Sequence, residues 1–131
     1  MMMKRNGKYG VALKEDRTLD GIVFDSKAEA TRYAQLKLYE RGGSISLLSL
    51  QPEYRVEING QHYCKYTADF KYFDALKERW VIEDVKSVAT DKDPAFRLRR
   101  KAAELFHGII VDAYFGKAKL TKPRKSRIIK K

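Results

Sequence analysis

The sequence has few of the residues that build disulfide frameworks and zinc centres. It contains one cysteine, Cys64, and two histidines, His62 and His107, among 131 residues. One cysteine cannot form an internal disulfide, and these three side chains fall short of the four ligands of a structural zinc site. No stretch approaches the ~18 apolar residues of a membrane-spanning helix, and no apolar signal segment begins the chain. These absences predict a protein of a reducing, cytoplasmic compartment with no membrane partner.

Nucleotide-binding and serine-nucleophile motifs are also missing, since no P-loop, G-x-G-x-x-G or G-x-S-x-G pattern occurs. A nucleotide cofactor is therefore not expected. Positive charge is abundant instead: 28 Lys and Arg against 17 Asp and Glu give a net charge of +11. Residues 91–131 contribute most of this excess, whereas residues 21–90 are balanced. A cationic surface attracts nucleic acid or anionic lipid, and without a basic amphipathic helix in the tail we favour nucleic acid.

Local patterns predict a helix followed by antiparallel strands. Ser26 and Glu29 form an S-x-x-E capping box, which predicts a helix start, and Gly42-Gly43 predicts its end. Asn59-Gly60 is the strongest two-residue signal for a hairpin. Alternating or apolar segments around it predict three antiparallel strands, at residues 51–58, 62–73 and 80–88.

A second helix and a last strand complete the expected domain. Asp93 is a helix cap with Pro94 at the first helical position, and Gly108 predicts the end. The stripe predicted to be buried consists of Leu98, Ala102, Leu105 and Phe106. Residues 109–115 then predict a strand covered on both faces. The expected organisation is a flexible basic arm at 1–8, a single α/β domain with a mixed sheet at 9–116 and a basic tail at 117–131.

Acidic residues in two of the expected strands suggest a metal site. Asp84 and Lys86 are two residues apart, so their side chains project from the same face of an extended strand. Asp69 lies in the neighbouring strand of the meander and can face Asp84. Close carboxylates repel each other in apolar surroundings, and a divalent cation such as Mg²⁺ or Mn²⁺ removes that repulsion. The alternative is a cross-strand salt pair on a solvated sheet face.

Three further residues have both a structural and a functional interpretation. Glu29 either closes the capping box or points its carboxylate toward the Asp69–Asp84 edge of the sheet. Tyr33, one turn later, either lies beneath that site or belongs to the core. Gln51 either begins a strand, with Pro52, or reaches a ligand near the metal.

Four motifs in order give the sequence a resemblance to a known group of enzymes. They are Phe24-Asp-Ser-Lys-Ala-Glu-Ala30 with Tyr33, Gln51-Pro52, Tyr66-x-Ala-Asp-Phe70 and Glu83-Asp-Val-Lys86. Together, from about Tyr9 to Gly116, they resemble a phage-borne family of the PD-(D/E)XK, or restriction-endonuclease-like, nuclease superfamily. The resemblance implies an αβββαβ core with a mixed central sheet flanked by helices. Ser87 departs from the glycine that many members of the superfamily carry after the lysine.

The resemblance also implies a metal-dependent phosphodiesterase. Asp69 and Asp84 match the two acidic motif residues, Lys86 the lysine and Glu29 the glutamate of the first helix. Mg²⁺ or Mn²⁺ would be held by Asp69, Asp84, Glu29 and the Val85 carbonyl, where it would activate the phosphate and a water molecule. Lys86 would orient the nucleophile and offset negative charge on the phosphoryl oxygens.

Small phage members of the superfamily suggest a more specific activity. They look most like structure-selective endonucleases, which implies a homodimer that cuts Holliday junctions or other branched DNA in the bacterial cytoplasm during phage DNA processing. A nuclease of the same core that acts on flap, nicked or sequence-specific duplex DNA is one alternative. A nucleic-acid-binding protein without catalysis is the other.

Basic residues of the second helix and the tail are the expected DNA contacts. Arg97, Arg100 and Lys101 lie away from the predicted apolar stripe, where they either contact phosphates or form an ordinary solvated face. The tail contributes Lys117, Lys119, Lys122, Arg124, Lys125 and Arg127. Because such contacts displace counterions, DNA affinity should depend steeply on salt.

Overall fold

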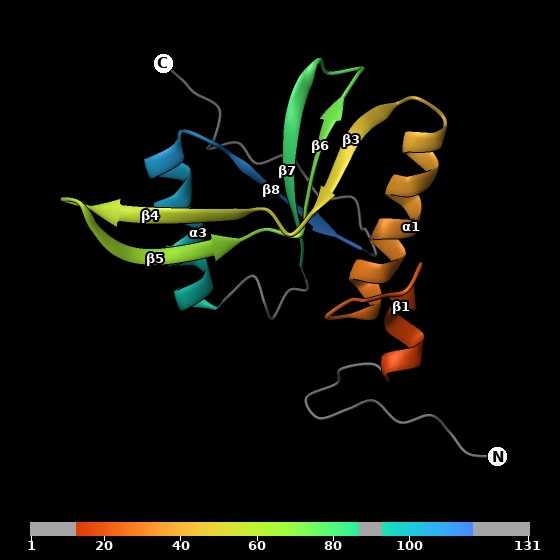
Figure 1. Ribbon diagram of the computed structural model, residues 1–131, viewed down its shortest axis with the longest axis horizontal. Helices are drawn as coiled ribbons and strands as arrows, with labels where there is room; N and C mark the ends of the chain where they lie inside the picture. Colours follow the sequence, from red (N-terminus) through yellow and green to blue (C-terminus); the bar gives the residue numbers. More distant parts are fainter. Residues whose placement is uncertain (1–12, 87–92, 117–131) are drawn as a thin grey trace.

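The computed structural model describes residues 13–86 and 93–116, which form a mixed α/β structure (Figure 1). In chain order the elements are η2 (Lys14–Arg17), β1 (Thr18–Leu19), β2 (Ile22–Val23), α1 (Lys27–Arg41), β3 (Ile45–Leu50), β4 (Glu53–Ile58), β5 (Gln61–Thr67), β6 (Phe70–Asp74), β7 (Arg79–Lys86), α3 (Pro94–His107) and β8 (Val111–Phe115). The predicted arm at 1–8, Ser87 and the six tail cations from Lys117 to Arg127 lie outside the described residues.

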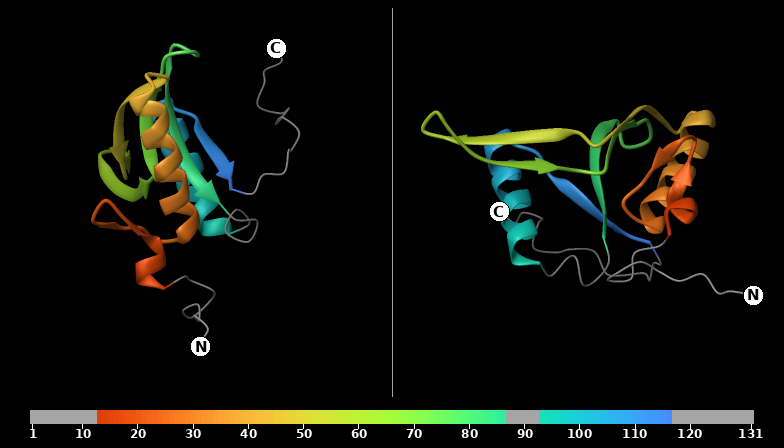
Figure 2. Two further views of the ribbon diagram at one scale, coloured as in Figure 1. Left: turned by 90° about the vertical axis from the view of Figure 1, so that its right-hand side faces the viewer. Right: turned by 60° about the horizontal axis from the view of Figure 1, so that its bottom comes forward.

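The central sheet has four strands in the order β3-β6-β7-β8. β3, β6 and β7 are antiparallel neighbours, whereas β8 runs parallel to β7, so the sheet is mixed as predicted. β4 and β5 form a separate two-stranded ribbon that turns at Asn59-Gly60, with both residues at positive φ (54° and 78°). This ribbon projects sideways from the central sheet, and Figure 2 shows it from two further sides.

Both predicted helices form, and each begins and ends as its sequence indicates. The Ser26 hydroxyl accepts a hydrogen bond from the Glu29 amide, and α1 ends at Gly42. Asp93 accepts a hydrogen bond from the Ala95 amide at the start of α3. α3 ends at Gly108, which adopts the left-handed conformation that glycine tolerates best. No helix in these described segments is long and apolar enough to cross a membrane.

Two strand predictions were wrong. β3 was not predicted, because its ISLLSL segment lacks a clean alternation: a bulge between Ser46 and Ser49 places Leu47 at positive φ. The strand expected at 62–73 is two strands, which separate at Ala68 and Asp69. The Ala68 amide still bonds to Pro52 beside the ribbon, but the Asp69 amide bonds to Glu83 of β7. The chain therefore leaves one sheet and enters the other within two residues.

The buried face of α3 was predicted wrongly except at Ala102, which is partly buried against the core. Leu98, Leu105 and Phe106 are 68%, 72% and 51% exposed, whereas Ala103 is fully buried. α3 packs its other side against β4 and β5, with the Phe96 ring against Tyr66. Helical spacing shows which residues share a face, but it does not say which face the rest of the protein covers.

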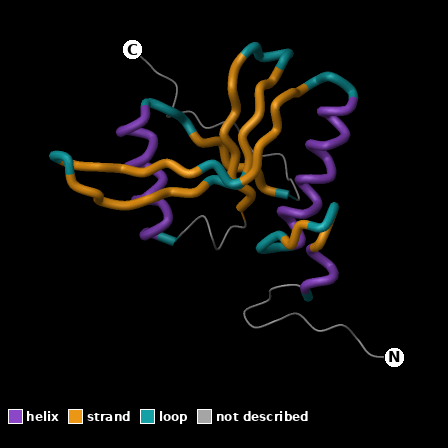
Figure 3. Tube along the Cα trace, viewed as in Figure 1, coloured by secondary structure: helices purple, strands orange, loops and turns teal. Residues whose placement is uncertain are grey.

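Two apolar clusters hold together the helices and strands whose arrangement Figure 3 traces. One joins α1 to the central sheet through Leu36, Phe70 and Val81. The other joins α3 and the β4–β5 ribbon to the opposite face through Tyr66 and Ile82, among others. Successive residues of β7 therefore point alternately toward α1 and toward α3.

Candidate functional site

Asp69 occupies the break between β5 and β6, where the chain passes from one sheet to the other. Its amide lies 3.1 Å from both the Glu83 carbonyl oxygen and Asp84 Oδ1, and its own Oδ2 accepts a hydrogen bond from the Val85 amide at 2.8 Å. Three consecutive residues of β7 thus hold Asp69 against Asp84. The structure brings these two acids together, as their positions in neighbouring segments predict.

Lys86 and Asp84 form a buried pair on the α3 side of the sheet. The Lys86 Nζ lies 3.3 Å from Asp84 Oδ2, and the two residues are only 7% and 1% exposed. The Phe96 ring of α3 covers the ammonium at 3.4 Å. Burial raises the pKa of Asp84 and lowers that of Lys86, while the charge of each opposes the shift of the other. A salt pair on a solvated sheet face, the alternative from the sequence, does not describe this arrangement.

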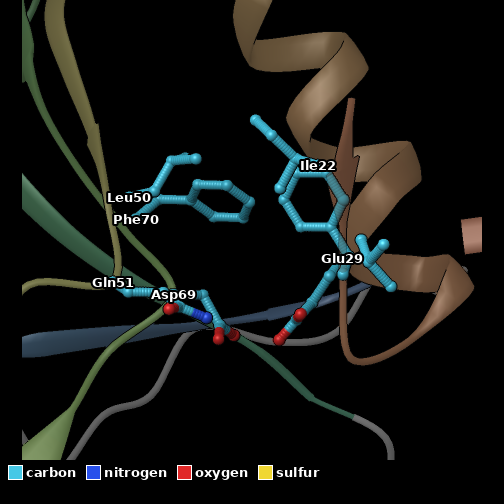
Figure 4. A pocket seen from close by; sticks show the side chains of 8 residues that line it. Ile22, Glu29, Leu50, Gln51, Asp69 and Phe70 are labelled. Carbon is cyan, nitrogen blue, oxygen red and sulfur yellow. The ribbon is translucent and has the colours of Figure 1, made fainter. Parts of the chain in front are cut away.

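Glu29 approaches Asp69 from α1, and the two carboxylates point toward each other (Figure 4). Burial, together with the hydrogen bond and negative charge of Asp69, raises the pKa of Glu29 to about 9. Glu29 Oε1 also accepts a hydrogen bond from the Asp25 amide at 3.1 Å, so the residue stabilises the helix start as well. The structural and the functional interpretation of Glu29 are therefore compatible.

A small pocket of about 90 Å³ opens beside these two acids (Figure 4). Its walls are mainly apolar, with Glu29, Gln51 and Asp69 as the polar residues of the lining. Gln51 is exposed, has a φ of 51° and donates its amide hydrogen to the Asp69 carbonyl oxygen at 2.9 Å. Tyr33 belongs to the core instead, because its ring packs on Phe24 and its hydroxyl donates to Asp20.

The donor chemistry of this site fits a hard divalent cation. Carboxylate oxygens are the ligands that Mg²⁺ and Mn²⁺ prefer. Asp84 Oδ2 is buried and has an ion pair but no well-aligned hydrogen bond from a described residue, so it retains an acceptor. Glu29 and Asp69 face each other closely enough to hold a shared proton that a cation would replace. Within residues 13–86 and 93–116, however, no three Asp, Glu, His or Cys side chains already stand in a metal-binding cluster.

A buried network that the sequence analysis missed ties α1 to β7 behind the site. Arg32 donates two hydrogen bonds to Glu83, from Nε to Oε2 at 2.6 Å and from Nη2 to Oε1 at 3.0 Å. The Tyr72 hydroxyl donates to the same carboxylate at 2.8 Å, and the Arg32 guanidinium stacks 3.8 Å from the Tyr114 ring centre. Arg32 follows Glu29 by one helical turn and Glu83 precedes Asp84, so the network fixes the distance between the two carboxylate-bearing elements. The available signal was Glu83 itself, one of two acidic residues in the otherwise apolar segment 80–85, because a carboxylate buried there needs a partner.

The predicted DNA-contacting residues of α3 divide into two kinds. Arg97 and Lys101 are exposed, as phosphate contacts require. Arg100 is half-buried, with its guanidinium 5.8 Å from the Phe96 ring centre. Its positive charge opposes the rise in the pKa of Asp84 and adds to the fall in the pKa of Lys86. Arg100 therefore lies beside the acid–lysine pair and not on the outer face of the helix.

Comparison with protein families places the chain in a group. A family described as "Protein of unknown function (DUF1064)" matches residues 7–121, most of the sequence. The chain belongs to the DUF1064 family. Comparison with curated proteins and with solved structures gave no significant match.

Proposed function

We propose that this chain is a Mg²⁺-dependent endodeoxyribonuclease with a PD-(D/E)XK, restriction-endonuclease-like core. The supporting observation is the convergence at the strand break: Asp69 is bonded to the β7 backbone at Glu83 and Val85, with Glu29 on one side and the Asp84–Lys86 pair on the other. The element order also supports the proposal, since a helix, antiparallel strands, a helix and a parallel strand follow one another as in that superfamily's core.

The residues of the site have distinct roles in this proposal. Mg²⁺ or Mn²⁺, held by Asp69, Asp84, Glu29 and the Val85 carbonyl, would supply Lewis-acid activation of the scissile phosphate and of water. Lys86 donates hydrogen bonds to the attacking water or to the phosphoryl oxygens, where negative charge develops. Phe96 restricts the ammonium to one position beside Asp84. Arg100 adds a second positive charge on the same side.

Branched DNA is the proposed substrate, Holliday junctions in particular, with a homodimer as the acting species in phage DNA processing. The net charge of +11 and the exposed Arg97 and Lys101 on α3 support binding to a polyanion. Flap, nicked or sequence-specific duplex DNA are the alternative substrates of the same chemistry.

Cleavage of defined DNA structures tests the proposal. The full chain is incubated with a four-way junction, a flap and a linear duplex, in Mg²⁺, in Ca²⁺ and in EDTA. We expect nicking of a branched substrate in Mg²⁺ only. Asp84→Asn should abolish cleavage while it retains DNA binding, whereas Asp112→Asn, the same change at a partly exposed acid of β8, should cleave like the wild type. Equal cleavage by the Asp84→Asn variant would refute the assignment.

A DNA-binding protein without catalysis is the second candidate. It is supported by the net charge of +11 and by the exposed Arg97 and Lys101, since these cations can bind a polyanion without any metal. Binding of all three DNA structures with no product in Mg²⁺ or Mn²⁺ would support this alternative against the nuclease.

A further inference from the structure

A cationic and aromatic surface lies at the far end of the sheet face that carries Asp84 and Lys86. Trp80 of β7 pairs directly with Phe73 of β6, and their rings meet edge to face with centres 5.5 Å apart. The Lys71 ammonium lies 4.9 Å from the centre of the Trp80 ring. Trp80 is 46% exposed, although large aromatic side chains are mostly buried on average. We call Lys71, Phe73 and Trp80 the Trp80 surface.

The strand register places this surface on the same face as the Asp84–Lys86 pair of the candidate site. Side chains two residues apart share a face of a strand, so Trp80 points to the same side as Asp84 and Lys86. Directly paired residues of antiparallel strands also share a face, which adds Phe73 opposite Trp80 and Lys71 opposite Ile82. The four residue steps from Trp80 to Asp84 span about 13 Å, a distance of roughly four nucleotide steps. The β6–β7 hairpin extends beyond the β4–β5 ribbon in Figure 1, so α3 and the ribbon leave its outer end uncovered.

We propose that the Trp80 surface binds unpaired nucleotides of a DNA substrate by stacking. A base has an accessible aromatic face only when it is unpaired, because the faces of paired bases are covered by their neighbours in the duplex. Exposed aromatic rings next to a cation are the elements that bind single strands without reading sequence. The neighbouring strand contributes exposed Ser46 and Ser49, opposite Phe73 and Lys71, and no carboxylate on this side.

Lys71 has a defined part in this binding. In the free protein the Lys71 ammonium lies over the face of the Trp80 indole ring. An exposed cation–π contact is weaker than base stacking, so an incoming base displaces the ammonium, which then pairs with an adjacent phosphate. This inference rests on the proposed nuclease function, from which it takes DNA as the substrate. It narrows the class of substrates to DNA with a single-stranded segment near the cut, in preference to intact duplex.

Trp80 provides a direct measurement because it is the chain's single tryptophan. The full chain is titrated in EDTA, where no cleavage is expected, with a 12-nucleotide oligothymidine and separately with a blunt 12-base-pair duplex. We expect the oligothymidine to quench tryptophan fluorescence in a saturable way and the duplex to leave it nearly unchanged. Single-strand binding without any change in fluorescence would overturn the proposal.

Substitutions separate stacking from general electrostatic attraction, with affinity measured by the anisotropy of a labelled oligothymidine. Trp80→Ala should weaken binding about 10-fold or more and Trp80→Phe should restore most of it, because one stacked base contributes about 5- to 150-fold. Lys71→Gln should reduce the logarithmic salt dependence by about 0.7, the value for one phosphate of a single strand. Tyr63→Ala, which removes another exposed aromatic ring, from β5, is the control and should bind like the wild type.

The outcomes distinguish this inference from the proposed nuclease activity. Quenching by oligothymidine together with no cleavage of any DNA in Mg²⁺ would refute the nuclease and keep the Trp80 surface. If the wild type cleaves DNA and Trp80→Ala binds single strands as tightly as the wild type, the nuclease proposal stands and the Trp80 surface is refuted. A Trp80→Ala variant that alters only the oligomeric state would assign the surface to a second copy of the chain and would also overturn the proposal.

Discussion

Replacement of Glu29 by glutamine tests the electrostatics of the site without any assumption about its reaction. Folding raises the pKa of Glu29 from 4.5 to about 9, through burial and the adjacent Asp69. Between these pH values the folded protein keeps a proton that the unfolded chain releases. The stability gained from that proton is fully present below pH 4.5 and is lost as the pH rises toward 9.

The magnitude follows from the proton balance. One proton bound only by the folded state changes the free energy of unfolding by about 1.4 kcal/mol per pH unit. Over the two units from pH 5.5 to 7.5 the upper limit is therefore about 2.7 kcal/mol, and solvent screening reduces it to roughly 1–2 kcal/mol. Glutamine does not titrate, so Glu29→Gln should gain about this much stability relative to the wild type over that interval.

Urea unfolding in EDTA at pH 5.5, 6.5 and 7.5 measures the difference, and subtraction of the two proteins cancels the other titrating groups. Glu53→Gln, which alters an exposed carboxylate paired with Lys65 on the ribbon, is the matched control and should show a constant difference from the wild type. Mg²⁺ should reverse the order at pH 7.5 because it replaces the proton in the wild type only. A Glu29→Gln difference that is flat or falls with pH would refute a shared proton between Glu29 and Asp69.

Three more measurements follow from the structure. Arg32→Ala leaves Glu83 buried without its ion pair and should lower the free energy of unfolding by about 3–5 kcal/mol. Lys37→Ala, at a surface pair of the same helix, should lower it by under about 0.5 kcal/mol. Equal losses of the two variants in urea unfolding would contradict the Arg32–Glu83 network. Ala103→Leu should cost about 1–3 kcal/mol by overpacking, and Leu105→Ala nearly nothing, which reverses the order expected from the sequence stripe. DNA affinity, measured by anisotropy in Ca²⁺, should fall ~10³-fold between 50 and 200 mM salt. An affinity that does not change with salt would refute the role of the basic residues in binding phosphates.

Local signals in the sequence were sufficient for the helices and the hairpin. The capping residues Ser26 and Asp93 and the turn Asn59-Gly60 determine local backbone geometry by themselves, and each appears where it was predicted. β3 was missed because its register contains a bulge at Leu47, and a bulge shifts the alternation on which strand prediction depends. The prediction of the buried stripe of α3 was wrong because tertiary packing decides which side of a helix is covered, and the β4–β5 ribbon covers the other side of α3.

The site was partly predictable for the same reasons. Asp84 and Lys86 share a strand face by spacing alone, and the structure keeps them 3.3 Å apart. The contacts of Phe96, Arg32 and Arg100 depend on how two helices pack on opposite faces of the sheet, which no spacing within one element reveals. The residue types within one strand were therefore enough to suggest the proposed chemistry. The residues that position Asp84 and Lys86 could be identified only from the three-dimensional structure.

The strand break at Asp69 explains why the acids meet where they do. In an unbroken strand Asp69 would continue the β5 ladder with β4, and its amide and carboxylate would be directed by that pairing. The change of sheets frees Asp69 from the ribbon and bonds it to Glu83, Asp84 and Val85 instead. The same break lets Glu29 reach Asp69 from α1, although Asp84 and Lys86 point to the opposite face. In the proposed nuclease, this position of Asp69 would let groups on α1 and on the α3 side of β7 act on one phosphate.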